Sequence, residues 1–299
     1  TRLRELVAQT VAQADATQER NIPLYIASSS LDTGAIENGM TCTWDCNFFA
    51  ASLAECLDWR GPVFTVSTAC TSSINALLSA SRQIQRGMAT DALVLSMELA
   101  SPFAVGGFTA LQLLAPERAL PFGHARNGLV LGEAVVALRL SDQPSRWRIR
   151  GGANVVDGSD PTGAVKQAVV DMCRRALDSS GLTNKDIDLI KVQAAGSPTS
   201  DAAEAAGLRQ IFTRMPALVT LKTALGHTLG ASGAAEIALL TACLEKRCLP
   251  RMDHRLDDAI GIKFANTLPP RVRYVLTNIL GFGGGHAAFV LEDTEAAKT

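Results

Sequence analysis

The segment GPVFTVSTACTSSINALLSASRQIQRG, residues 61–87, decides the fold class of this chain. Residues 61–70 are rich in β-branched and apolar side chains and predict a strand that ends at Cys70. Residues 71–87 carry apolar side chains at helical spacing, and Gly87 is a typical residue to close such a helix. The segment therefore places a cysteine in a turn between a strand and a helix.

This position of Cys70 favours chemistry at its sulfur. The dipole and the unpaired N–H groups at the start of a helix stabilise a thiolate, and the same N–H groups can bind a developing oxyanion. A buried structural cysteine at the end of a strand is the alternative. Residues 61–87 alone leave both interpretations open.

The rest of the chain continues the alternation of strands and helices. Around the cysteine turn we expect a helix at 47–59 and strands at 22–30 and 91–100, with two strands and a glycine turn in 128–142. A second series comprises strands at 147–156 and 186–197, helices at 162–182, 200–212 (N-capped by Ser200 or Asp201) and 230–247, and a glycine hairpin at 273–293. We therefore expect an α/β chain with two similar halves, 1–146 and 147–299.

The bulk composition is that of a globular protein. Of its 299 residues 47% are hydrophobic, and the formal net charge is −1, which favours neither a nucleic-acid binder nor a membrane-surface binder. Apolar stretches are interrupted well before the ~20 residues that a membrane span needs. Residues 1–16 are amphipathic and carry acids, unlike a signal peptide. We therefore expect a cytoplasmic protein.

The seven cysteines are interpreted as free thiols, because their number is odd and their spacing irregular. Cys42 and Cys46, in CTWDC, suggest half of a metal site, but no Cys/His pair at suitable spacing completes four ligands. We expect no bound metal, nucleotide or flavin. Every cysteine except Cys70 is interpreted as a small buried hydrophobic residue.

Three further segments carry glycines beside polar residues. PFGHARNGLVLGEAV (121–135) is a tight loop that enters a strand pair, and LKTALGHTLGASGA (221–234) places Lys222 and His227 before a glycine-rich helix start. NILGFGGGHAAFVLE (278–292) is a hairpin whose glycine backbone can approach a substrate closely. Together with STACTSS, and in this order, these segments resemble the elongating branch of the β-ketoacyl synthase family, from about residue 22 to about residue 292.

The resemblance rests on four motifs. The family's TACxS motif is matched by Thr68, Ala69, Cys70, Thr71 and Ser72. Its PFDxxRDGFVxGEG segment is matched by Pro121, Phe122, Arg126, Gly128, Val130, Gly132 and Glu133. Its KSxxGHxxGAAG segment is matched by Lys222, Gly226, His227, Gly230, Ala231 and Gly233, and its NSFGFGGxN terminus by Asn278, Gly281, Phe282, Gly283 and Gly284.

The resemblance implies a thiolase-type duplicated αβαβα layered fold and a set of catalytic roles. Cys70 would take the acyl chain from a thioester on the phosphopantetheine of an acyl carrier protein. The N–H groups of Cys70 and Phe282 would form the oxyanion hole, with Phe282 and Gly283 in the gating turn. His227 would stabilise the enolate formed when a malonyl thioester loses CO₂. Lys222 would orient the site, and Glu133 would belong to the same polar network.

The chain also departs from the family pattern. Gly123 and Asn127 replace two aspartates, and in QAAGSPTSD Gln193 stands where the HGTxTxxxD motif has its histidine. A glutamine amide can donate a hydrogen bond to an enolate oxygen, but it cannot carry a proton. His124 and His286 are interpreted as structural. We also expect the N-terminal half to be shortened, without the family's first strand.

Several functions fit these features. Cys70, Lys222 and His227 favour an active condensing enzyme, whereas Gln193 and the lost aspartates favour a partner subunit like the chain-length factors of type II polyketide synthases. A degenerate synthase subunit that pairs with a complete ketosynthase, as in systems that make polyene chains, combines both, although a homodimer is an alternative. A plain acyltransferase or thioesterase is a further candidate, because one Cys and one His suffice for acyl transfer. A thiolase is disfavoured, since no cysteine follows Cys248.

Overall fold

The structure is a computed structural model that describes residues 2–14, 20–39, 45–159 and 161–296. The chain forms two compact units, and each is described by itself. Unit 1 comprises Thr1–Ala110, Leu131–Pro144 and Thr228–Ala238, and unit 2 comprises Leu111–Val130, Ser145–His227 and Leu239–Thr299. Each unit is therefore assembled from segments that lie far apart in the sequence.

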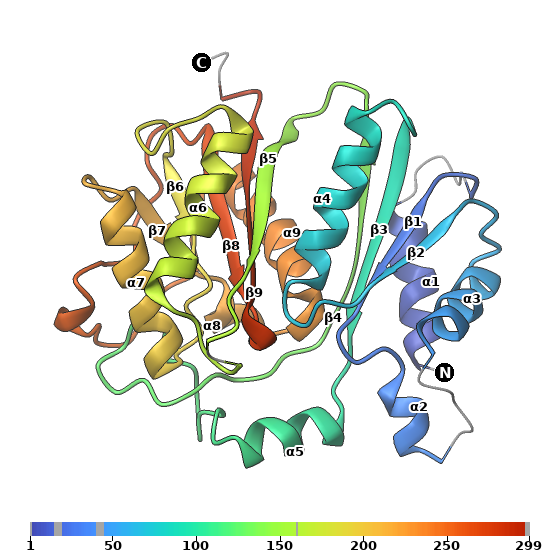
Figure 1. Ribbon diagram of the computed structural model, residues 1–299, viewed down its shortest axis with the longest axis horizontal. Coiled ribbons are helices and arrows are strands. Elements are labelled where there is room, and N and C mark those ends of the chain that lie inside the picture. The colour runs from blue at the N-terminus through green and yellow to red at the C-terminus, as the bar shows by residue number, and fades with distance from the viewer. Residues whose placement is uncertain (1, 15–19, 40–44, 160, 297–299) are drawn as a thin grey trace. The chain divides into compact units, whose positions relative to one another are not determined.

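The described part of unit 1 is built on a four-stranded sheet with the order β2–β1–β3–β4 (Figure 1). The central strand β1 (Leu24–Ala27) is parallel to β2 (Val63–Val66) and β3 (Asp91–Glu98), and β4 (Ala134–Ser141) is antiparallel to β3. Leu24 is in register with Val63 on one side and Leu93 on the other. In this sheet β2 is an edge strand.

Helices cover both faces of this sheet. α1 (Arg2–Ala14) and α3 (Cys46–Cys56) bury their apolar stripes against the face that carries Ile26 and Leu95. Tyr25 points to the opposite face because side chains alternate along a strand. There its hydroxyl donates to Gln83 (2.8 Å) on α4 (Ser72–Gln85). The short elements of this unit are α2 (Thr33–Glu37), α5 (Pro102–Ala110) and η1 (Leu229–Ala231).

The described part of unit 2 is built on a five-stranded sheet with the order β5–β9–β8–β6–β7. β5 (Trp147–Val156), β9 (Gly285–Asp293) and β8 (Tyr274–Leu280) are successively antiparallel, whereas β6 (Leu189–Lys191) is parallel to both β8 and β7 (Ala217–Val219). The core combines these strands with α6 (Lys166–Ser180) and α7 (Pro198–Ile211). The remaining elements are α8 (Lys222–Leu225), η2 (Asp258–Ile260), η3 (Phe282–Gly284) and α9 (Ser232–Glu245), whose first part belongs to unit 1.

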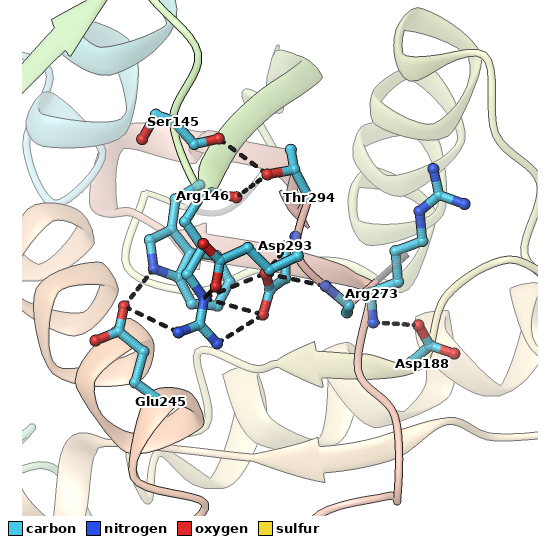
Figure 2. A network of polar contacts seen from close by, with 10 residues as sticks. Ser145, Arg146, Asp188, Glu245, Arg273, Asp293 and Thr294 are labelled. Atoms are coloured by element: carbon cyan, nitrogen blue, oxygen red, sulfur yellow. Dashed lines mark hydrogen bonds and ion pairs between the residues drawn. The ribbon is translucent and has the colours of Figure 1, made fainter. Parts of the chain in front are cut away.

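A polar network in unit 2 joins the start of β5 to the ends of its neighbours (Figure 2). The Arg146 guanidinium donates to Asp293 (Nη2–Oδ2, 3.0 Å) after β9, and the Trp147 indole donates to Glu245 (2.8 Å) at the end of α9. The Thr294 hydroxyl donates to the carbonyl of Arg146 (3.0 Å). These bonds hold the first residues of the edge strand β5, where its ladder with β9 begins.

Most of the expected elements are confirmed. α4 ends just before Gly87 (φ 68°), and α6 ends at Gly181 (φ 68°), where glycine accepts the left-handed backbone that closes a helix. The hairpin expected at 273–293 is β8, η3 and β9. Cys42 lies outside the described residues, and Cys46 begins α3.

Three predictions from the sequence are wrong. Among the described cysteines other than Cys70, only Cys173 and Cys243 are buried as expected, whereas Cys56 and Cys248 are exposed and Cys46 is partly exposed. In residues 128–142 only β4 is a strand, because Leu129 pairs with the backbone of residues 113–115 instead of folding back on β4. The N-cap of α7 is Ser197, whose hydroxyl accepts from the Ser200 N–H, because Pro198 occupies the first turn, where its missing N–H costs nothing.

Candidate active site

The cysteine turn of unit 1 connects β2 to α4. β2 ends at Val66 and α4 begins at Ser72, so Cys70 lies in the intervening turn, not at the end of the strand itself. Cys70 is 4% exposed. Ala69 before it has φ 50°, a left-handed conformation that is uncommon for a residue with a Cβ atom. This tight turn places the cysteine directly before the first turn of α4.

Hydroxyl groups within the turn hold this conformation. The Ser72 hydroxyl donates to the Ala69 carbonyl (2.6 Å) and accepts from the Thr68 N–H (2.9 Å). The Thr71 hydroxyl donates to the Thr68 carbonyl (2.7 Å), and the Asn75 amide donates to the Thr68 hydroxyl (2.9 Å). All of these partners lie within eight residues of sequence, so the turn is a locally specified structure.

Lys222 and His227 are in direct contact in unit 2. Lys222 begins α8, and Gly226 (φ 69°) turns the chain so that His227 follows one short turn later. Both side chains are buried, and Lys222 Nζ lies 3.3 Å from His227 Nδ1. The backbone N–H of His227 donates to the carbonyl of Val130 (2.7 Å), which holds the main chain at this residue.

The surroundings of His227 keep its imidazole neutral. Burial, and then the positive charges of Lys222 and Lys191, lower the pKa of His227 well below its ordinary value. A charged lysine donates to Nδ1, which assigns the ring proton to Nε2. His227 therefore offers a hydrogen-bond donor at Nε2 without carrying a positive charge.

The loop that carries Gln193 is held by two buried carboxylates on one face of α7. Glu204 accepts from the N–H groups of Gln193 (2.7 Å) and Ala194 (2.8 Å). Asp201 accepts from the N–H groups of Ala195 (3.1 Å) and Gly196 (3.2 Å). Four consecutive backbone donors thus bind two carboxylates that are three residues apart.

Burial changes the titration of both carboxylates. It raises the pKa of Asp201 to about 7, against the opposing effect of the N–H groups that it binds. Burial also raises the pKa of Glu204, while its backbone donors and the charge of Lys191 act in the opposite direction. The Gln193 side-chain oxygen is itself buried and has no hydrogen-bond partner among the described residues.

Glu204 and Lys191 were not predicted from the sequence as site residues, and Asp201 was considered there as a possible N-cap. Lys191 is 1% exposed and ends β6, two residues before Gln193. Its ammonium donates to the Asn278 carbonyl (2.6 Å) on the neighbouring strand β8. The available signal was in SPTSDAAEAAG, where two acids stand three residues apart among small apolar residues. Acidic residues among small apolar residues on a helix are candidates for burial. Buried carboxylates are nearly always hydrogen-bonded, often to backbone N–H groups.

The glycine turn with Phe282 and Gly283 forms η3 between β8 and β9. Phe282 is half-buried, and Gly283 is exposed with φ 73°. The Gly283 N–H donates to the Pro161 carbonyl (2.8 Å). A Cβ atom on the next residue, Gly284, would lie 1.5 Å from the Asp157 carbonyl oxygen, so only glycine fits there.

The remaining predicted residues lie in other surroundings. Glu133 is in unit 1, where it binds the Arg2 guanidinium (2.8 and 2.9 Å) and the Ala100 N–H (2.6 Å), and these bonds lower its pKa. At Gly123 in unit 2 a Cβ atom would lie 2.9 Å from Leu120, so the family's aspartate does not fit this loop without a shift.

The predicted site residues are divided between the two units. Cys70 belongs to unit 1, whereas Gln193, Lys222, His227 and the glycine turn belong to unit 2.

Comparison with known proteins places these features in a family. The N-terminal domain model of the β-ketoacyl synthases matches residues 12–144, and the C-terminal domain model matches residues 148–255. The chain belongs to the β-ketoacyl synthase family. Its fold is therefore the thiolase-type fold of the ketosynthases. The division into halves at 146/147 stays a prediction.

Several relatives are polyketide and fatty-acid synthases. The chain is 30% identical over 257 residues to the spectinabilin polyketide synthase system protein NorC of Streptomyces orinoci, and 30% identical over 274 residues to the actinorhodin polyketide putative β-ketoacyl synthase 1 of Streptomyces coelicolor. These matches cover 79% and 83% of the chain. The chain spans 11% of NorC and 58% of the actinorhodin protein, so it is short beside its relatives.

Solved ketosynthases have the same fold. The structure of the ketosynthase ApeO in complex with its chain length factor ApeC, from Xenorhabdus doucetiae, matches with a TM-score of 0.80 and 25% identity over 98% of this chain and 78% of that one. A β-ketoacyl synthase from Burkholderia phymatum matches with a TM-score of 0.84 over 98% of this chain and 83% of that one, at 20% identity. None of the described helices is long and apolar enough to cross a membrane.

Proposed function

We propose that this chain is a ketosynthase-type subunit that accepts an acyl group on Cys70 and takes part in decarboxylative condensation with a malonyl group on an acyl carrier protein. The buried Lys222–His227 pair carries this proposal, because it supplies a neutral imidazole with a donor at Nε2. The similarity to a chain in the complex of ApeO with its chain length factor ApeC supports a role beside a partner subunit.

In the proposed acyl transfer the Cys70 thiolate attacks the carbonyl carbon of an acyl thioester. The C–S bond to the phosphopantetheine sulfur breaks, and that sulfur leaves with the carrier protein as a thiolate, which takes a proton from solvent. The negative charge on the carbonyl oxygen would be stabilised by the N–H groups of Cys70 and Phe282, the roles that the family motifs imply. Phosphopantetheine arrives as part of the substrate.

In the proposed condensation the malonyl thioester loses CO₂ and becomes an enolate. The enolate oxygen would accept from His227 Nε2, and the Gln193 amide would supply a second donor. The nucleophilic carbon then attacks the acyl–Cys70 thioester, a new C–C bond forms, and the Cys70 thiolate is released. Gln193 can supply this hydrogen bond but no proton, so the isolated chain should decarboxylate slowly if the step needs a proton from this position.

The partner is proposed to be a complete ketosynthase, in a heterodimer. Unit 1 exposes apolar side chains that a partner would cover: α5 has no buried residue, with Phe103 67% exposed, and Phe64 on the edge strand β2 is 40% exposed. Soluble monomers rarely present such side chains as an extended surface. An obligate interface of this kind buries more than about 2,000 Å² in total.

A catalytically weak, chain-length-factor-like subunit is the second candidate, and Gln193 is the observation that favours it. A subunit of this type would shape the acyl tunnel of its partner and would not need the lost histidine. A non-condensing acyltransferase that uses Cys70 and His227 is a third candidate.

Two measurements separate these functions. Intact-mass labelling with chloroacryl-pantetheine should place one adduct on Cys70, and Cys70→Ala should abolish it while Cys56→Ala, at an exposed thiol, should not. Decarboxylation of malonyl-carrier protein by the isolated chain should be slow, and Gln193→His should raise the rate by roughly 10²–10⁴-fold if proton transfer limits it. Labelling spread over several cysteines would reject the acyl-accepting role, and fast condensation by the unmodified chain would reject the weak-subunit candidate.

The pairing has its own test. Light scattering of the chain expressed alone should show aggregation or a low yield of soluble protein, and co-expression with a complete ketosynthase should restore a soluble heterodimer. A stable homodimer with full condensing activity would contradict the proposed partner.

A further inference from the structure

His286 is a buried histidine whose ring has no hydrogen-bond partner. It is the second residue of β9 and is 1% exposed. Neither of its ring nitrogens has a partner among the described residues. Its neighbours in register are Val155 on β5 and Leu280 on β8. A neutral imidazole always carries one N–H donor and one acceptor, so this arrangement leaves both unpaired at a free-energy cost.

Asp157, directly after β5, is the charged neighbour of this ring. One of its carboxylate oxygens accepts from the Ser159 N–H (3.0 Å) and hydroxyl (2.7 Å). The other oxygen is buried and has no partner among the described residues. Asp157 and His286 influence each other electrostatically: the carboxylate raises the pKa of His286, and the imidazole lowers that of Asp157.

The same aspartate is attached to the glycine turn by its backbone. The Asp157 N–H donates to the Gly284 carbonyl (2.9 Å), and the Gly283 N–H donates to the Pro161 carbonyl (2.8 Å). The close approach of Asp157 to Gly284 leaves no space for a side chain at that position. His286, two residues after Gly284, therefore lies at the base of a turn that two backbone hydrogen bonds fasten.

Other charged groups have little access to this ring. The strands on both sides place Val155 and Leu280 beside it, and η3 contributes Phe282 and two glycines. The helix α6 also packs on β9, and its charged side chains all retain some solvent exposure: Lys166, Asp171, Arg174, Arg175 and Asp178. Burial is the main influence on His286 and lowers its pKa, and Asp157 opposes this in part.

We propose that His286 is a positioning residue for the glycine turn, and that proton uptake by its ring loosens the turn from Asp157 and Pro161. The turn carries Phe282, so the consequence for catalysis rests on the proposed function. The response of the turn to protons does not.

The direction of the effect follows from linkage. In the fastened arrangement the pKa of His286 is lowered, so this arrangement binds the proton more weakly than one in which the ring is hydrated. The hydrated ring has an ordinary pKa of about 6.5. The fastened turn is therefore favoured above about pH 6.5, and it loses population as the pH falls below that value.

The experiment is amide hydrogen exchange of the full chain between pH 8.0 and 5.5, followed by NMR at the N–H groups of Gly283 and Asp157. After correction for intrinsic exchange rates, their protection should fall by up to about tenfold per pH unit below about pH 6.5. His286→Asn keeps a donor and an acceptor but binds no proton, so its protection should stay level. His124→Asn, at an exposed histidine, should behave like the wild type.

Amides in the middle of β8, such as Leu276, serve as the internal reference and should not respond. Protection at Gly283 that is level in the wild type, or that falls equally in His286→Asn, would overturn the proposal. If His286→Asn does not fold, the NMR titration of the His286 ring in the wild type decides. A pKa of 6.5 or higher rejects the proposal. A pKa below 6.5, with the ring taking up its proton over the same pH range in which the Gly283 amide loses protection, supports it. Because no substrate is used, failure of the proposed condensing activity leaves this test unaffected.

Discussion

The turn around Cys70 and the loop around Gln193 are held in different ways. In the Cys70 turn, serine and threonine hydroxyls bind carbonyls and N–H groups three or four residues away, and all of the donors and acceptors are neutral. In the Gln193 loop, four N–H groups bind the buried carboxylates of Asp201 and Glu204, which belong to the following helix. The first loop depends on local geometry, and the second depends on buried charge.

This difference predicts unequal sensitivity to mutation and to pH. Hydrogen bonds made by neutral hydroxyl groups contribute about 1 kcal/mol each to the free energy of unfolding, and these groups do not titrate near neutral pH. A buried carboxylate that satisfies two N–H groups costs much more to remove, because both donors are left unpaired in a medium of low dielectric constant. The Cys70 turn should therefore tolerate single changes that the Gln193 loop does not.

The largest effect is expected for Glu204→Leu. It should lower the free energy of unfolding by about 2–6 kcal/mol, because the buried N–H groups of Gln193 and Ala194 each lose their acceptor at about 1–3 kcal/mol. Urea unfolding followed by circular dichroism measures this change. Glu204→Gln keeps one acceptor and should cost less. Glu55→Leu, on the exposed face of α3, is the control and should stay within about 0.5 kcal/mol of the wild type. Equal losses at Glu204 and Glu55 would remove the distinction between the two loops.

The second effect concerns pH at Asp201. Its folded-state pKa of about 7 lies above the unfolded value of about 3.9, so the folded chain binds the proton more tightly. The stabilisation that this proton provides is complete below about pH 4 and is lost as the pH rises through 7. The stability difference between the wild type and Asp201→Asn should therefore shift by about 2–3 kcal/mol against the wild type between pH 5 and pH 8. Paired urea unfolding curves at the two pH values test this, and a difference that is constant with pH would contradict it.

The smallest effect is expected for Ser72→Ala in the Cys70 turn. Loss of the bonds to the Ala69 carbonyl and the Thr68 N–H should cost about 1–2 kcal/mol, with no change between pH 5 and pH 8. Thermal unfolding measures the loss, and Ser67→Ala, at an exposed position of the same turn, is the matched control. A loss as large as that of Glu204→Leu would show that the turn is not held by independent local bonds.

Local interactions determine the features of the fold that were predicted correctly from the sequence. The strand, turn and helix around Cys70 were predicted because capping, helical spacing and glycine preferences act over a few residues. Lys222 and His227 were identified by their motif, and the structure brings their side chains into contact. Glu133 was expected in the catalytic network, and in the structure its carboxylate binds Arg2 and Ala100 in unit 1. Its predicted role stays untested.

Nonlocal pairing determines the features that local sequence patterns do not reveal. The second strand expected in 128–142 does not form, because Leu129 finds its partner in residues 113–115, a choice that no local pattern reveals. Lys191 was read as part of an ordinary strand, yet its ammonium crosses to the Asn278 carbonyl on the neighbouring strand. The unpaired ring of His286 was likewise invisible, since a histidine after glycines has the same local pattern whether or not a partner is present.

The sequence by itself determined the α/β class, the family and the identity of the candidate nucleophile, because motifs and periodicity are properties of neighbouring residues. Only the tertiary structure decided which charges are buried and what they bind. Burial depends on the whole packed unit, and it sets the neutral state of His227, the raised pKa of Asp201 and the unpaired ring of His286. Each of these states arises from the cost of removing a charge or a polar group from water, which the folded surroundings alone impose.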